Sequence, residues 1–149
     1  MGHDSCEGED LLATYLAAHY KVTGTAKPFV LRVGHRSAEL ASVHLANGAK
    51  CSAFITAWNP RSVVRSEADN RASQKRLESD LAAIGVTLVA GIGEDPARLW
   101  PGEPSVLAVG ISRSEAERVG REFGQRAIVW SGESAIPELI DLAVPRRSG

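Results

Sequence analysis

This chain has few cysteines, almost no net charge and no long apolar run. Two cysteines, Cys6 and Cys51, are too few for a framework of disulfide bonds, so we expect reduced thiols. Seventeen Lys and Arg residues against 18 Asp and Glu residues leave a net charge of −1, which gives no global field to attract nucleic acid or an anionic membrane. No apolar run approaches the about 18 residues of a membrane-spanning helix, and the acidic N-terminus is unlike a secretory signal. The sequence therefore predicts a cytoplasmic protein with neither a nucleic acid nor a membrane as partner, and it leaves the oligomeric state open.

The motifs of metal- and cofactor-dependent enzymes are missing as well. None of the four histidines lies at ligand spacing from a Cys or Glu residue. Gly91 and Gly93 lack the third glycine and the following helix of a dinucleotide-binding fingerprint, and no nucleophile-elbow or Walker pattern occurs. We therefore expect no metal and no cofactor, and the sequence does not decide whether the protein is an enzyme.

What the chain does have is the composition of one globular domain. Its 149 residues are 44% hydrophobic and 23% charged, which is ordinary for a domain that buries a sizeable core. We expect a flexible N-terminal tail over residues 1–8, one domain over residues 9–142 and a disordered tail over residues 143–149.

Alternating helix and strand patterns predict an α/β fold. Helical spacing of apolar residues and serine caps predict four helices, and short apolar runs between turn residues predict five strands. The helices are expected at residues 9–20, 37–46, 66–84 and 112–123, and the strands at residues 29–33, 54–58, 86–90, 105–109 and 127–130. Residues 137–142 fit either an edge strand or a helical turn.

The expected architecture is a single layered domain with a mixed, mostly central sheet of about five strands, flanked by about four helices. The sheet is expected to be mixed because the strands at residues 86–90 and 105–109 are joined without a helix, which suits antiparallel neighbours. Residues 91–104 between them carry two glycines and three prolines, so we expect a long, mobile or functional loop there.

Four segments resemble a family of small bacterial proteins that is known only as a domain of unknown function. They are the strand and turn at residues 54–60, the pair Asn70 and Arg71, residues 100–105 and residues 123–130. The resemblance runs from the first helix to about Leu139 and implies a stand-alone domain of about this length, with no assigned activity or catalytic residues. Gly102 stands where the resemblance leads us to expect a second proline, which affects only the stiffness of that loop.

The end of the strand at residues 54–58 is the strongest candidate for a site. A buried strand stops there in a dense polar turn, and ligands of α/β proteins bind beyond the carboxyl ends of such strands. Asn59 and Arg61 could bind a polar or anionic ligand, but they could equally serve the turn and the solvent. Asn70, in the next helix, could hydrogen-bond the Asn59 loop, which would be a structural role.

Three further features are candidates. Arg113 begins a helix directly after a strand, which suits an anion, although the capping box explains the same residues. Trp100 fits either a lid over a pocket or a hydrophobic plug. Glu94, Asp95 and Glu103 are loop carboxylates that would hold a metal only if they converged.

The leading hypothesis is a domain that binds a small polar or anionic ligand at the ends of the central strands. If the strands before Asn59 and Arg113 are parallel neighbours, both residues reach one crevice. The alternatives are a protein-interaction or regulatory module without a ligand, and a carboxylate-dependent hydrolase or nuclease. The candidate ligand-binding residues are Thr56, Trp58, Asn59, Arg61, Ser62, Asn70, Trp100, Glu103 and Arg113.

Overall fold

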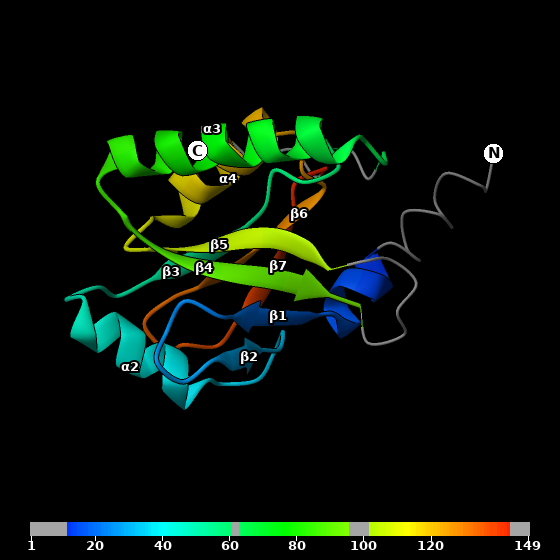
Figure 1. The fold of residues 1–149 in the computed structure, drawn as a ribbon. Helices are drawn as coiled ribbons and strands as arrows, with labels where there is room; N and C mark the ends of the chain where they lie inside the picture. Colours follow the sequence, from blue (N-terminus) through cyan, green and yellow to red (C-terminus); the bar gives the residue numbers. More distant parts are fainter. Residues whose placement is uncertain (1–11, 61–62, 96–101, 144–149) are drawn as a thin grey trace, which may run out of the picture.

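The computed structural model describes residues 12–60, 63–95 and 102–143, and these form one seven-stranded sheet with helices on both of its sides (Figure 1). Residues 12–17 are helical. The other helices are α2 (Ala38–Ala46), α3 (Glu67–Ile84) and α4 (Arg113–Glu122). The strands are β1 (His19–Val22), β2 (Phe29–Leu31), β3 (Ser52–Ile55), β4 (Thr87–Glu94), β5 (Glu103–Val109), β6 (Ala127–Ser131) and β7 (Glu138–Asp141). None of the helices in the described ranges is both long enough and apolar enough to cross a membrane.

The strand order is β2-β1-β4-β5-β3-β6-β7, and every neighbouring pair is antiparallel. The fold is therefore α/β as expected, but the prediction of a mixed sheet with about five strands is wrong. β1 was missed because its first two residues were assigned to the end of the first helix, which stops at residue 17. Of the two predictions for residues 137–142, the edge strand is confirmed by β7.

The expected loop at residues 91–104 is wrong at both of its ends. β4 continues to Glu94 and β5 begins at Glu103, and the two strands pair from Thr87 with Val109 to Gly93 with Glu103. The glycines and prolines of this segment predict a loop. Glycine is, however, tolerated within a strand where another chain segment approaches closely.

Serine caps begin the helices as the sequence predicts. The hydroxyl groups of Ser37, Ser66 and Ser112 each accept a hydrogen bond from a main-chain N–H of the first turn. Helix α3 ends at Gly85, whose φ of 96° is readily adopted by glycine.

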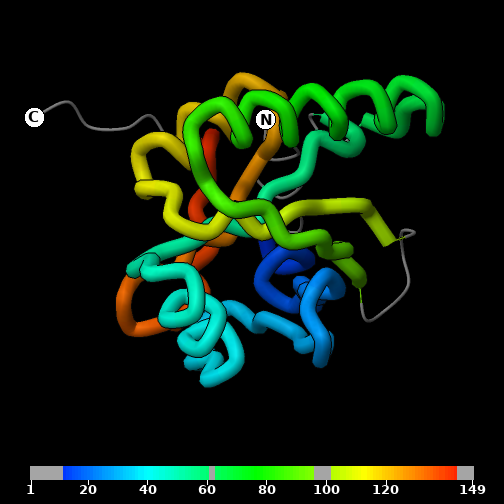
Figure 2. The backbone as a smooth tube through the Cα atoms, turned by 60° about the vertical axis from the view of Figure 1, so that its left-hand side comes forward, coloured from blue at the N-terminus to red at the C-terminus, as the bar shows by residue number. Residues whose placement is uncertain are grey.

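Strand β3 is buried on both faces and divides two apolar cores. Ala53 and Ile55 face the core under α3 and α4, whereas Phe54 belongs to the core that includes α2 and β1. In both views α3 and α4 lie on one side of the sheet and α2 lies on the other (Figures 1 and 2). The prediction that Phe54 and Ile55 lie buried in a central strand is confirmed.

The sheet curls so that β1 comes back toward β3. Three strand spacings separate β1 from β3 in the sheet, which is about 14 Å in a flat arrangement. Yet the rings of Tyr20 and Phe54 meet edge to face with 5.4 Å between their centroids. Gly91 of β4 makes this approach possible, because a Cβ there would lie 2.6 Å from Phe54 Cε2.

Candidate functional site

The segment after β3 is held to the start of β5 and to α3 by side chains. The Thr56 hydroxyl donates a hydrogen bond to the carbonyl of Pro104 (2.7 Å) and accepts one from the main-chain N–H of Trp58 (3.0 Å). The main-chain N–H of Ala57 donates to Gln74 Oε1 of α3 (2.9 Å). The exit from β3 is therefore fixed on both of its flanks before the chain reaches Asn59.

Asn59 and Asn70 form a reciprocal pair. The main-chain N–H of Asn59 donates to Asn70 Oδ1 (2.8 Å), and Asn70 Nδ2 donates back to Asn59 Oδ1 (2.8 Å). Asn70 is only 1% exposed, so these bonds satisfy a buried amide. The expectation that Asn70 bonds the Asn59 loop is confirmed, and this role is structural.

The side-chain NH₂ group of Asn59 points to Glu103. Asn59 Nδ2 donates to Glu103 Oε2 at 3.2 Å, across 44 residues of sequence. Burial raises the pKa of Glu103 to about 7, although the hydrogen bond from Asn59 acts in the opposite direction. Glu103 therefore exchanges its proton near neutral pH, which is unusual for a carboxyl group.

Glu103 lines a small cavity of about 50 Å³, which we call the Glu103 cavity. Its polar lining residues are Tyr15, Tyr20, Thr56, Glu103, Ser105 and Gln125. Burial and, to a smaller extent, Tyr15 and Glu103 raise the pKa of Tyr20, so its phenol stays neutral. The cavity therefore holds one carboxyl group among neutral side chains.

A second hollow lies against α3. This open groove of about 810 Å³, which we call the Trp58 groove, has the volume of a small-molecule site. Its aromatic, amide and charged lining residues are Trp58, Glu67, Arg71, Gln74, Lys75 and Glu78. Gly102 and Pro104 also line it, so the groove and the Glu103 cavity adjoin the same start of β5.

Gln74 is the residue of this groove that the sequence analysis missed. Its Nε2 atom is buried without a hydrogen-bond partner in the described part of the chain. A sequence signal for it exists, because Asn70 and Gln74 continue the apolar row of Leu77 and Leu81 at helical spacing. Polar residues in such a row are expected to be buried and to need partners.

Arg113 does not join the site, which corrects the expected convergence with Asn59. β3 and β5 are neighbours, but they are antiparallel, so their carboxyl ends lie at opposite ends of the sheet (Figure 1). Arg113 forms ion pairs with Glu117 (3.1 Å) and Glu138 (3.9 Å).

Of the other candidates, Arg61, Ser62 and Trp100 lie outside the described residues, whereas Thr56, Trp58, Asn59, Asn70 and Glu103 come together.

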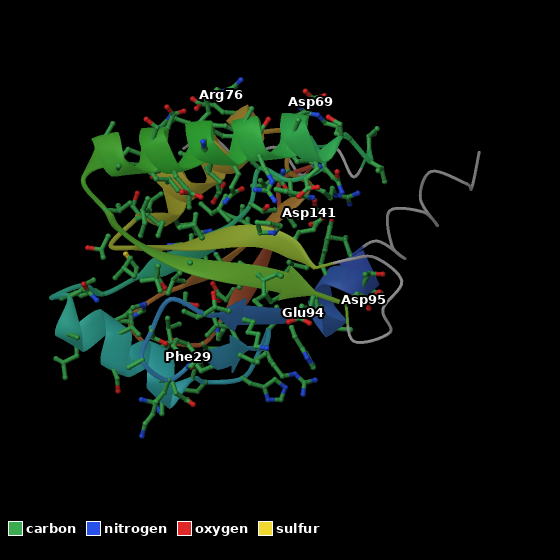
Figure 3. All side chains as sticks on the ribbon, in the orientation of Figure 1. Phe29, Asp69, Arg76, Glu94, Asp95 and Asp141 are labelled. Atoms are coloured by element: carbon green, nitrogen blue, oxygen red, sulfur yellow. The ribbon has the colours of Figure 1, made fainter. Side chains whose placement is uncertain are left out.

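The carboxylates of residues 91–104, the segment that was expected to be a loop, do not form a metal site in the described ranges. Glu94 and Asp95 lie beside each other where β4 ends (Figure 3), and Glu94 approaches Lys21 at 3.9 Å. Within residues 12–60, 63–95 and 102–143, no group of three or more His, Cys, Asp or Glu residues could hold a metal ion.

Comparison with known proteins gives a family and no activity. No curated protein and no solved structure matches this chain. A family model matches residues 55–128, a segment that runs from the end of β3 into β6 and includes Asn59, Gln74 and Glu103. Residues 55–128 of the chain thus match a family described as a protein of unknown function (DUF3293).

Proposed function

We propose that the protein binds a small molecule in the Trp58 groove, through an oxygen or nitrogen acceptor on that molecule. One observation carries the proposal: Gln74 lines the groove, and its Nε2 atom is a buried donor that lacks a partner among the residues described. A buried donor left without an acceptor costs about 1–3 kcal/mol, so an acceptor brought by a ligand would recover that free energy.

The orientation of the Gln74 amide follows from its other hydrogen bond. Gln74 Oε1 accepts from the main-chain N–H of Ala57 at 2.9 Å, which only an oxygen can do. The NH₂ group is therefore the end that remains for a ligand. Because Gln74 is 6% exposed and held by Ala57 in the segment after β3, the donor is preorganised for binding.

The charged residues that line the groove favour neither an anionic nor a cationic ligand. Glu67 and Glu78 balance Arg71 and Lys75, and Arg71 already contacts Glu67 at 2.6 Å. The expected preference for anions depended on two arginines at one site. Arg113 lies at the other end of the sheet, so it cannot contribute to that preference. Trp58 adds an aromatic surface, so the ligand that suits the groove is a flat polar molecule with an acceptor.

The experiment uses three aromatic probes that differ in their polar group. Benzamide and benzoate carry acceptors, whereas benzylammonium carries only donors. We expect benzamide and benzoate, and not benzylammonium, to change the tryptophan fluorescence of the protein, and the Trp58→Phe variant to lose this response. Saturable binding of all three probes alike would contradict selection by a donor.

Variants of Gln74 then test the donor itself. Gln74→Met keeps the volume and removes the donor, together with the acceptor of the Ala57 N–H, and we expect it to weaken benzamide binding about tenfold, which corresponds to one hydrogen bond. Asn47→Leu also replaces an amide with an apolar side chain, at an exposed position outside the groove, and should leave the affinity unchanged. Equal affinities for the protein and the Gln74→Met variant would show that the buried amide is not part of the site.

A further inference from the structure

The Glu103 cavity shares no lining residue with the Trp58 groove and has a different chemistry. Side chains from β1, from the segment after β3 and from the start of β5 line it, and so do residues of β6 and β7. The curl of the sheet brings Tyr20 of β1 against Phe54 of β3, and both residues line the cavity. A site of this kind exists only in the folded domain.

Three of the four hydroxyl groups that line the cavity donate their hydrogens to main-chain carbonyls. Tyr20 donates to the carbonyl of Tyr15 (2.6 Å), Thr56 to that of Pro104 (2.7 Å) and Ser105 to that of Glu103 (2.9 Å). Toward an occupant of the cavity, these three oxygens can therefore only accept hydrogen bonds.

The Gln125 amide follows the same pattern. Its Nε2 donates to the carbonyls of Trp58 (3.4 Å) and Phe123 (3.3 Å), which leaves its oxygen as an acceptor. Glu103 receives one hydrogen bond, from Asn59, and has no ion pair with any residue described. When ionised, Glu103 is thus a half-buried negative charge beside four acceptor groups, with no cation to balance it among the residues that the structure describes.

We propose that the Glu103 cavity binds a small ammonium group, either the ammonium ion or the end of a primary amine. A volume of about 50 Å³ holds one or two heavy atoms, since one water takes about 30 Å³ of liquid. An ammonium group brings the positive charge that Glu103 lacks and N–H donors for the surrounding oxygens. Divalent ions prefer several carboxylates, and this cavity has one.

Thermal melts at equal ionic strength test the proposal. At about pH 8, where Glu103 is ionised, we expect ammonium or methylammonium chloride to raise the Tm by about 2–4 °C above sodium chloride. Tetramethylammonium, which is larger and has no N–H donor, should have no effect. Near pH 5.5, where Glu103 is protonated, the difference between ammonium and sodium should disappear.

Two variants distinguish ammonium binding in the cavity from a general effect of salt on stability. Glu103→Gln keeps the shape and removes the charge, so it should abolish the response to ammonium. Glu78→Gln, at an exposed position outside this cavity, should keep it. Equal melting temperatures in ammonium and sodium, or an unchanged response in Glu103→Gln, would overturn the proposal. A rise in potassium as large as in ammonium would assign the cavity to an alkali ion instead.

Discussion

At the scale of single residues, Asn59 sets the geometry of the site. Its φ of 45° lies in the left-handed region, which asparagine tolerates better than most residues with a side chain. That conformation ends the extended chain and lets one side chain serve both Asn70 and Glu103. The Asn-Pro turn was visible in the sequence, whereas its contact with Glu103 was not, because 44 residues separate the two.

Removing Asn70 should loosen this turn. Asn70→Ala takes away the hydrogen bonds at both ends of the Asn59–Asn70 pair and leaves the N–H of Asn59 without its acceptor. We expect a loss of about 2–3 kcal/mol in urea-induced unfolding. Asn47→Ala removes an exposed hydrogen bond and should cost less than about 1 kcal/mol. Similar losses for the two variants would mean that the pair does not stabilise the fold.

Glu103 should make stability depend on pH. Its pKa in the folded protein is about 7, above the ordinary 4.5, so the folded state binds more protons than the unfolded state between these values. Stability should therefore fall as pH rises from about 4.5 to 7, by about 2 kcal/mol after allowance for its partial exposure.

The difference between the protein and Glu103→Gln isolates this effect. His44, whose pKa is lowered by burial, acts in the opposite direction, since its neutral form is favoured in the fold. Urea melts in sodium buffers should give a difference in stability between the two proteins that grows with pH up to about 7 and then stays constant. A constant difference across that range would refute the raised pKa.

At the scale of elements, strands that contain turn-forming residues were the hardest to predict. Helices α2, α3 and α4 were recognisable because apolar spacing and serine caps are local signals. The end of β4 was not, because Gly91 and Gly93 suggest a loop, and the close approach of Phe54 and of the Lys21 main-chain oxygen from other strands explains Gly91.

Two glycines of β4 provide a matched pair of substitutions. A Cβ at Gly91 would lie 2.6 Å from Phe54 Cε2 and 2.8 Å from the main-chain oxygen of Lys21, whereas at Gly93 the nearest atom lies at 3.9 Å. We expect Gly91→Ala to destabilise the fold by about 1–3 kcal/mol and Gly93→Ala to be nearly neutral or stabilising. Thermal melts that rank the two variants in the other order would contradict the close packing of Phe54 on β4.

At the scale of the whole molecule, strand direction decides which residues meet. The sequence indicated strands and helices, but a helix between two strands does not by itself fix their order or direction. In this sheet β5 runs antiparallel to β3, so Asn59 and Glu103 meet at one end and Arg113 lies at the other. The strand order places β4 and β5 between β1 and β3, which long-range packing decides rather than local pattern.

Phe54 should be the side chain on which this curled arrangement depends. It is 4% exposed, and it contacts Tyr20 of β1 from the centre of the sheet. We expect Phe54→Ala to cost about 3–5 kcal/mol of unfolding free energy. Leu45→Ala, at a position 84% exposed, should change stability by less than about 0.5 kcal/mol. A loss below about 1 kcal/mol for Phe54→Ala would show that the two halves of the sheet do not depend on this contact.

The side-chain amide of Gln74 offers the most direct test of ligand binding in the Trp58 groove. NMR spectroscopy can follow its two N–H protons while benzamide is added, with the Asn47 amide, which lies outside the groove, as an internal reference. We expect one Gln74 proton to move downfield and saturate as it gains an acceptor, while the Asn47 protons stay in place. Gln74 protons that remain unmoved when benzamide is saturating, or that already show a strong hydrogen bond in the free protein, would contradict the proposed function.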